Sequence, residues 1–403
     1  MTEDRVRELL RDRHAPDEAA AQERAWRVVG RAFAEREPAR RPRRPRPLVA
    51  VVTAVLALLV AGLTPPGQAV ADWLRDAVKP GREDARDALV SLPASGRLIV
   101  TSQRGPWIVE RDGSKRLLGA FDDASWSPRG LFVVVTRGHE VIALEPGGRP
   151  RWSLARSGRV RAARWSPDGF RIAYHTGDAL RIVAGDGTGD RPLADGVGAA
   201  PSAWWPGPAH RLAYADKGGR VAMVDGDSGR VLWRSGPADV VTRLAWSSDG
   251  TRLLAVSPGA VRQFDASGQL LGNLEMTVGT RAATAAFRPA AHEFALVAHV
   301  AAGDRSRLEV VRMTRRGTGR RLLLAGAGRF GDVAWAPDGE WLLAGWEAAD
   351  QWVFVRTGAR ARPTTERVRA VGSISRQFDP GRSERAEFPG LGEWCCPPVG
   401  RPK

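Results

Sequence analysis

The sequence contains almost no lysine. Only four of its 61 basic residues are Lys, so arginine carries nearly all of the formal net charge of +16 at pH 7. A strongly basic chain can bind nucleic acid or another polyanion. A GC-rich coding sequence explains the preference for Arg equally well, together with the 45 glycines. The composition leaves both interpretations open.

Cysteine is also scarce. Cys395 and Cys396 are the only two, and they are adjacent. Neighbouring cysteines provide neither a disulfide framework nor the spaced ligands of a metal cluster. Because a disulfide between sequence neighbours is strained and rare, we expect free thiols or one intermolecular bond.

Motifs of catalysis and of cofactor binding are missing as well. We find no P-loop, dinucleotide fingerprint or zinc deaminase motif. The stretch 226–229 matches the letters of a serine-protease nucleophile motif and 185–190 resembles part of a calcium loop, but both are expected to be hairpin turns. No metal-ligand spacing connects the histidines, which are His14, His139, His175, His210, His292 and His299. We therefore predict no catalytic, cofactor or metal residue, no cofactor, and leave the binding residues unassigned.

No apolar run reaches the about 20 residues of a full membrane span. The longest apolar run is Leu48–Leu63, sixteen residues without a charge in which only Thr53 is polar, and Thr64 extends it slightly. Five arginines crowd the eight residues 40–47 before it. The positive-inside rule then predicts a transmembrane helix over 48–64, with a cytoplasmic N-terminus. A cleaved signal peptide is the rival interpretation, because Ala69-Val70-Ala71 has the form of a cleavage site.

The segments on either side of this run are short. Residues 1–47 predict a cytoplasmic head that is helical and rich in Arg. Its apolar stripe of Trp26, Val29 and Phe33 could bind a cytoplasmic protein or an anionic lipid surface. Residues 65–95 predict a juxtamembrane segment. Its amphipathic helix over 67–79 suits either the membrane interface or a place under the next domain.

The rest of the chain is organised by a repeated turn. Its clearest copy is Trp165-Ser166-Pro167-Asp168-Gly169, and related copies begin at Trp126, Trp246 and Trp335. Worn copies begin at Trp205 and Phe287, so that the steps between successive aromatic residues are 39, 40, 41, 41 and 48. A period near 40 with four short strands per unit predicts an all-β fold, the β-propeller.

Counting strands predicts seven blades over residues 96–380. Three strands precede the first motif, at Arg97–Ser102, Trp107–Arg111 and Arg116–Gly119. We predict that Arg367–Ile374 completes this blade, so that N- and C-terminal strands close the ring. Residues 381–403 are then a C-terminal tail.

The motif resembles the TolB-type, WD40-like propeller repeats of bacterial envelope proteins, which share a Trp-Ser-Pro-Asp-Gly turn before an apolar strand. The resemblance covers about residues 96–380. It is strong at Trp165, Trp246 and Trp335 and weaker at the other copies. The layout of head, span, propeller and Cys395-Cys396 tail also resembles membrane-tethered propeller proteins of actinobacteria.

Together these features predict a single-pass membrane protein with an extracytoplasmic seven-bladed propeller that acts as a binding, sensing or protein-interaction scaffold in the cell envelope. Its partner is expected to be a protein or an envelope polymer, and nucleic acid is not expected. One basic cluster could contact an anionic lipid or a wall polymer, and it comprises Arg312, Arg315, Arg316, Arg320 and Arg321. Two alternatives stay open: an envelope enzyme with its site in the propeller channel, and an anti-sigma-like signal relay across the membrane.

Overall fold

The computed structural model describes residues 91–314, 316–357, 368–379 and 386–396. The predicted head (1–47), the predicted transmembrane helix (48–64) and residues 65–90 of the juxtamembrane segment lie outside these ranges. Within the described ranges, no helix has both the length and the apolar character that a membrane crossing requires.

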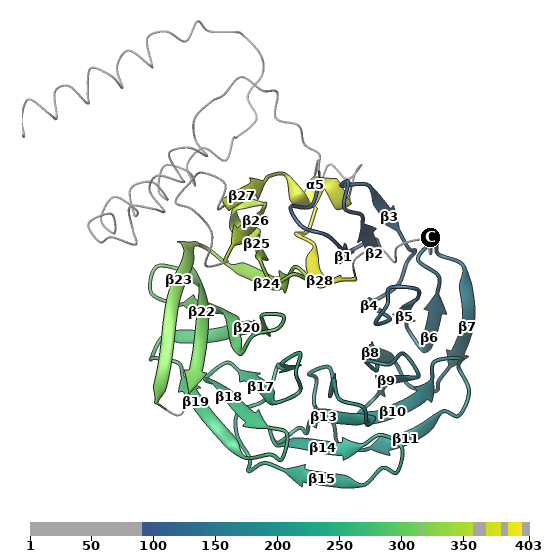
Figure 1. The fold of residues 1–403 in the computed structure, drawn as a ribbon. Helices are drawn as coiled ribbons and strands as arrows, with labels where there is room; N and C mark the ends of the chain where they lie inside the picture. The colour runs from purple at the N-terminus through teal and green to yellow at the C-terminus, as the bar shows by residue number, and fades with distance from the viewer. Residues whose placement is uncertain (1–90, 315, 358–367, 380–385, 397–403) are drawn as a thin grey trace, which may run out of the picture. The chain divides into compact units, whose positions relative to one another are not determined.

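The described chain forms seven four-stranded antiparallel sheets arranged as blades around a central axis (Figure 1). Blade 1 is β4 (Asp123–Trp126), β5 (Val133–Arg137), β6 (Glu140–Leu144) and β7 (Pro150–Ala155). Blade 2 is β8 (Val160–Trp165), β9 (Arg171–Thr176), β10 (Ala179–Ala184) and β11 (Arg191–Ala194). Blade 3 is β12 (Ala203–Trp204), β13 (Arg211–Ala215), β14 (Val221–Asp225) and β15 (Val231–Arg234).

The remaining blades follow in chain order until the ring closes. Blade 4 is β16 (Arg243–Trp246), β17 (Arg252–Ser257), β18 (Ala260–Asp265) and β19 (Leu270–Glu275). Blade 5 is β20 (Thr280–Phe287), β21 (Glu293–Val300), β22 (Arg305–Thr314) and β23 (Gly317–Ala327). Blade 6 is β24 (Phe330–Trp335), β25 (Trp341–Trp346), β26 (Gln351–Arg356) and β27 (Val368–Val371), with a 3₁₀ turn at Glu347–Ala349. Blade 7 is β28 (Gly390–Cys395), β1 (Arg97–Ser102), β2 (Gly105–Val109) and β3 (Lys115–Leu117), and the short helix α5 (Ile374–Phe378) precedes β28.

The repeated motif forms the turn between the first and second strands of a blade. In blade 2, the Asp168 carboxylate accepts hydrogen bonds from the Ser166 hydroxyl (2.6 Å) and the Phe170 amide (2.9 Å). Gly169 has φ 81°, in the left-handed region that a glycine adopts without a steric cost. The motif is therefore a self-bonded turn, as its Asp-Gly pair predicts.

The motif aromatic residue connects each blade to the one before it. Three indole N–H groups donate to a backbone carbonyl of the preceding blade: Trp204 to Arg164 (2.9 Å), Trp246 to Ala203 (3.2 Å) and Trp335 to Ala286 (3.0 Å). In each case the acceptor is the residue just before the motif aromatic of that blade. One side chain thus fills the space between two sheets and satisfies a carbonyl group of the neighbour.

The predicted motif position in blade 3 was wrong by one residue. The Trp205 amide donates to the Arg211 carbonyl (2.9 Å), as the Ser166 amide does to Arg171. Trp205 therefore occupies the serine position, and Trp204 is the interblade aromatic. The connection before the second strand is one residue longer here, so counting along the sequence cannot separate two adjacent tryptophans.

Ring closure by N- and C-terminal strands is confirmed, but the predicted closing strand was wrong. Residues Val368–Val371 pair with β26 and are the fourth strand of blade 6. The strand that pairs with β1 is β28, which lies in the stretch predicted as a tail and aligns Trp394 with Leu98. The prediction counted blade 6 as complete too early in the chain. Trp394 is consequently a seventh copy of the motif aromatic, followed by Cys395-Cys396 in place of Ser-Pro.

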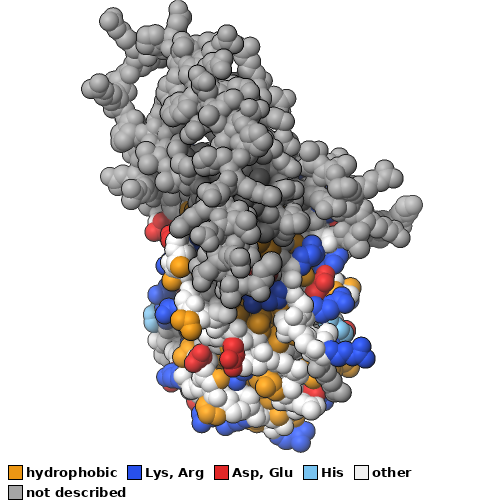
Figure 2. Space-filling model, turned by 90° about the vertical axis from the view of Figure 1, so that its left-hand side faces the viewer, with side chains coloured by type: hydrophobic (Ala, Val, Ile, Leu, Met, Phe, Trp, Pro, Cys, Tyr) orange, Lys and Arg blue, Asp and Glu red, His pale blue; other side chains and the backbone are white. Residues whose placement is uncertain are grey.

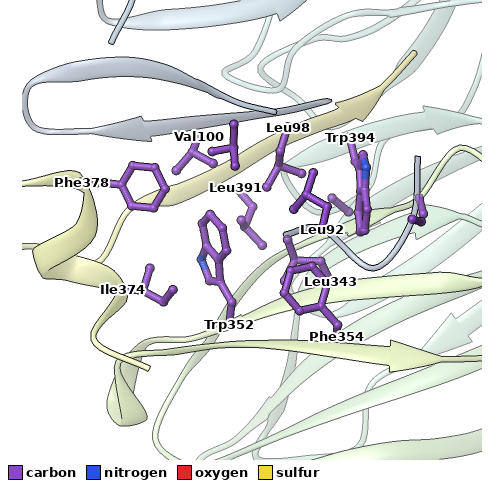
Figure 3. Packing of buried hydrophobic residues seen from close by; sticks show 14 residues of the cluster. Leu92, Leu98, Val100, Leu343, Trp352, Phe354, Ile374, Phe378, Leu391 and Trp394 are labelled. Atoms are coloured by element: carbon purple, nitrogen blue, oxygen red, sulfur yellow. The ribbon is translucent and has the colours of Figure 1, made fainter. Parts of the chain in front are cut away.

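A hydrophobic cluster surrounds this closure (Figure 3). Trp352 of β26 and Phe378 of α5 are fully buried, with ring centroids 5.3 Å apart. Phe354 lies edge-on to Trp394, with ring centroids 5.9 Å apart. Leu98 of β1 and Leu391 of β28 complete the contact between the two ends of the chain. Burial of these side chains by both termini stabilises the closed ring.

We predict that Trp394→Ala destabilises the whole propeller. The Trp394 side chain is 6% exposed, and truncation of a buried aromatic residue costs about 3–5 kcal/mol. Thermal unfolding of the full chain, followed by circular dichroism, should show a clear decrease in Tm. Phe170→Ala is the matched control because Phe170 is 66% exposed, and its Tm should stay near that of the parent. Equal melting of both variants would show that β28 does not close the ring.

Candidate ligand site in the central channel

The inner strands of the propeller line a cavity of about 680 Å³. Residues of six blades contribute to it, and blade 5 does not. The charged side chains in its lining are Asp122, Asp123, Arg164, Arg243, Asp332 and Glu393. Equivalent positions on the other inner strands are small, such as Ala203 of blade 3. The lining therefore combines six charged side chains with polar and apolar groups in similar measure.

Irregular strand pairing accompanies several of these charges. The pairing of β8 with β9 shifts register between Arg161 and Arg164, and Ala162 within the shift has φ 56°. The pairing of β24 with β25 shifts between Phe330 and Val333, next to Asp332. A bulge inserts one extra residue and changes the direction of the side chains beside it. Bulges of this kind are common next to functional sites.

Arg164 joins carboxylates from two other blades. Its Nη1 donates to Asp123 Oδ2 of blade 1 (2.8 Å), and its Nε lies 3.8 Å from Glu393 Oε1 of blade 7. Glu393 also accepts from the Ser125 hydroxyl (2.9 Å) and the Trp126 amide (3.0 Å). Burial opposes the charge on Arg164, but the carboxylates of Asp123 and Glu393 raise its pKa. The guanidinium is thus a fixed cation at the ring closure.

A second arginine has a similar place across the channel. Arg243 Nη1 donates to Thr284 Oγ1 of blade 5 (3.1 Å) and lies 3.4 Å from Asp332 Oδ1 of blade 6. About one third of its side chain is exposed, as is one quarter of Arg164. Asp332 and Glu393 are each more than 40% exposed. These side chains are already held in place by hydrogen bonds and ion pairs, and they are accessible to a ligand. Ligand binding would therefore cost little additional side-chain entropy.

The one histidine behind the lining does not activate a nucleophile. His175 Nε2 lies 2.9 Å from the hydroxyl of Ser202, which lines the cavity, and its Nδ1 lies 3.1 Å from Arg161 Nη1. Arginine can only donate, so Nδ1 accepts and Nε2 carries the proton. Burial, followed by the charges of Arg161 and Arg164, lowers the pKa of His175 to about 3. A general base would need a free Nε2 toward Ser202, so this pair does not form a catalytic dyad.

The other predicted candidates lie in turns. The Ser228 hydroxyl donates to Asp225 of its own hairpin (2.8 Å), and Asp186 accepts from the Thr188 hydroxyl and amide in the loop that resembled a calcium site. Within the described parts of the chain, no three potential ligands among His, Cys, Asp and Glu gather around a metal position. These segments are structural turns, as the sequence indicates.

The two cysteines differ from expectation, because they form a disulfide with each other. Cys396 has φ 54° and is 7% exposed. Its Sγ lies 3.3 Å from the Pro128 carbonyl, against the motif turn of blade 1. The left-handed turn at Cys396 and its burial against blade 1 bring the neighbouring thiols together. The prediction of free thiols was therefore wrong.

Sequence reasoning did not single out Arg164, Arg243, Asp332 or Glu393. The signal available was their spacing from the motif aromatic. Arg164 and Glu393 directly precede Trp165 and Trp394, and Arg243 and Asp332 come three residues before Trp246 and Trp335. Charged residues on the innermost strand of a propeller, where small residues are otherwise found, mark the channel lining.

Comparison with known proteins supports the fold and no more. No family model and no curated protein matches the sequence. Among solved structures, a chain of the mitotic checkpoint complex has a TM-score of 0.51 and 15% identity, over 65% of this chain and 90% of its own length. A chain of Kuenenia stuttgartiensis hydrazine synthase has a TM-score of 0.46 and 16% identity, over 58% of this chain and 75% of its own. The TM-score of 0.51 shows a fold shared with the checkpoint-complex chain, at an identity that carries no function across.

Two histidines contact carboxylates of the preceding blade outside the channel. His210 Nε2 lies 2.5 Å from Asp168, the motif carboxylate of blade 2, and its Nδ1 lies 2.7 Å from Asp227. His292 Nε2 lies 2.6 Å from Asp249, the motif carboxylate of blade 4. Both histidines come just before the second strand of a blade whose own motif is worn. Blades 3 and 5 thus lack the Asp-Gly turn and instead contact the turn of the preceding blade.

We predict that the contribution of His210 to stability depends on pH. Partial burial opposes its charge, but the contacts with Asp227 and Asp168 raise its pKa, and the pKa of Asp168 is lowered. A raised histidine pKa stabilises the fold below the unfolded pKa of about 6.5, and this stability is lost as the pH rises through the folded pKa. The carboxylates must also be ionised, so stabilisation decreases again below about pH 4.

Urea unfolding of the parent and of His210→Gln should therefore differ most at about pH 5 to 6 and converge at alkaline pH. His139→Gln is the control, because His139 contacts the Ser157 carbonyl rather than a carboxylate. A His210→Gln deficit that is as large at alkaline pH as at pH 5 would mean that the contact is not between charges.

Proposed function

We propose that the protein is a membrane-anchored, extracytoplasmic β-propeller that acts as a binding or sensing scaffold of the cell envelope, with its ligand in the central channel. The observation that carries this proposal is the channel lining. Arg164 and Arg243 each contact side chains of two other blades, and both remain accessible in a cavity of about 680 Å³. Fixed, accessible charges in a cavity are features of a recognition site.

The ligand that fits best is a protein segment or an envelope polymer that carries both hydrogen-bond donors and acceptors. Asp332 and Glu393 can accept hydrogen bonds from such a ligand, and the two guanidinium groups can donate to it. Trp126, Trp165 and Trp204 border the cavity but are at most 8% exposed, so the exposed charged groups carry most of the proposed recognition. Propellers commonly act as scaffolds for protein interactions, although a fold alone does not determine function.

The envelope location is supported by the sequence on the N-terminal side of the propeller. Arginines at 40–46 precede the uncharged run Leu48–Leu63, and this order favours a cytoplasmic N-terminus with the propeller outside. The motif copies resemble TolB-type repeats of envelope proteins, and the propeller ends in a disulfide, a bond that is typical of oxidising compartments. The relay and enzyme alternatives have no comparable support among the described residues.

The location is tested with single introduced cysteines. Val278 is fully exposed, so Val278→Cys should react with a membrane-impermeant maleimide in intact cells. Ala20→Cys in the head should react only after lysis. Labelling of both sites, or of Ala20→Cys alone, in intact cells would contradict the proposed orientation.

Ligand binding in the channel is tested by photo-crosslinking in native membranes. A photoreactive amino acid replaces Thr242, which is exposed in the channel lining, or Leu270, which is 51% exposed on the outer strand of blade 4. We expect a discrete crosslinked product only from position 242, reduced several-fold when Arg243→Ala is added. Products from position 270 with none from position 242 would place the ligand outside the channel.

A further inference from the structure

The outer strand of blade 5 differs from every other outer strand of the ring. β23 has 11 residues, whereas β3, β7, β11, β15, β19 and β27 have three to six. It stands at the outside of the ring in Figure 1, and in the described sheet it pairs only with β22. Its outer edge therefore presents backbone N–H and C=O groups along its length, a template for pairing with another extended chain.

The first half of this strand is exposed on both faces. Residues 317–322 are all exposed, although successive side chains of a strand point to opposite faces. Leu322 is 43% exposed and begins the apolar run Leu322–Leu324. An incoming strand could pair here without displacing any described part of the chain.

The same edge is strongly basic. Glu309 and Glu293 form ion pairs with Arg320 (2.7 Å) and Arg312 (3.8 Å). Arg316 and Arg321 are exposed and have no ion pair within the described residues. Figure 2, which faces this side of the ring, shows more basic than acidic side chains among hydrophobic and uncharged ones. The edge thus has an unneutralised positive charge.

This charge decides which chain can occupy the edge. A second copy of the protein would place the same arginines opposite one another, and like charges directly opposite destabilise a strand pair. Opposite charges across a strand pair stabilise it instead. Because Arg321 has no ion pair within the described residues and is next to Leu322, a complementary strand needs an acidic residue opposite Arg321 and an apolar residue opposite Leu322. Arg316, directly before the strand, favours further acidic residues in the same segment.

We propose that β23 binds an extended acidic segment of a partner protein by β-strand addition. Backbone hydrogen bonds to the edge hold the segment, and Arg316 and Arg321 select its acidic residues. This surface lies on the outside of blade 5, which contributes nothing to the lining of the channel, so the inference stands independently of the channel ligand.

Fluorescence anisotropy on the full chain in neutral detergent tests this with two labelled probe peptides. The first is Thr-Val-Thr-Glu-Glu-Val-Thr-Val, and the second has the same sequence with alternate backbone amides methylated, which removes hydrogen-bond donors and keeps the charge. We expect the first to bind and the second to bind at least about tenfold more weakly, since backbone pairing supplies the affinity.

Charge variants give the second arm. Arg316→Glu with Arg321→Glu should weaken the first peptide at least about tenfold. Arg116→Glu with Arg234→Glu changes the net charge equally on the exposed outer strands β3 and β15, and should leave binding unchanged. Arg320 is left intact because it pairs with the buried Glu309.

Any of four results would overturn the proposal. Equal binding of both peptides, or equal loss in both double variants, would show a general attraction of a basic protein for anions. If the first peptide does not bind at millimolar concentration, β23 is not a docking site for such a segment. Self-association of the Arg316→Glu, Arg321→Glu variant without peptide binding by the parent would show that the arginines only prevent edge pairing.

Discussion

The propeller depends on the aromatic side chain that lies between neighbouring blades, which is a tryptophan in six blades and Phe287 in blade 5. Where the bond forms, the motif tryptophan is on one inner strand and its N–H donates to the carbonyl of the preceding inner strand, as in Trp204 to Arg164. One residue therefore fills the gap between two twisted sheets and removes a buried, unpaired carbonyl group. The acceptor comes just before the motif aromatic of the preceding blade, so the bond links two strands that both carry this aromatic position. It forms at Trp204, Trp246 and Trp335. The packing of this aromatic residue is repeated around the ring, and the hydrogen bond accompanies it in blades 3, 4 and 6.

The ring closure and the channel are consequences of the same constraint. Trp394 supplies the seventh motif aromatic and pairs with Leu98 of β1, 296 positions earlier in the sequence. Glu393, the residue before it, enters the channel beside Arg164 and accepts a backbone N–H from Trp126. The cluster of Arg164, Asp123 and Glu393 in the candidate ligand site therefore includes a residue of the strand that closes the ring. A ligand that bridges these blades would stabilise the closed state, and the stabilisation would rise with the logarithm of ligand concentration above Kd.

Much of the fold could be predicted because a short local motif specifies the turn and the packing between blades. Residues Trp165–Gly169 contain both the aromatic residue that fills the space between blades and the glycine with positive φ that the turn needs. Because this motif recurs along the chain, its copies gave the repeat period and the number of blades. Closure by Gly390–Cys395 could not be read in the same way, because pairing with Arg97–Ser102 is a contact between chain ends that no local pattern specifies. The two adjacent tryptophans at 204 and 205 were ambiguous for the opposite reason, since either satisfies the spacing. The charged residues of the channel were not predicted, because Arg164, Arg243 and Asp332 reach their partners only when separate blades come together. The bulges near Arg164 and Asp332 also have no recognisable sequence pattern.

The closed ring is tested most directly by hydrogen–deuterium exchange of the intact, unmodified chain. If β28 is the inner strand of blade 7, the amides of Gly390–Cys395 that pair with β1 should exchange as slowly as those of β25 in the middle of blade 6, because both open only when the ring unfolds. Exchange of Gly390–Cys395 at the rate of an unfolded peptide, with β25 still protected, would contradict a ring closed by this strand.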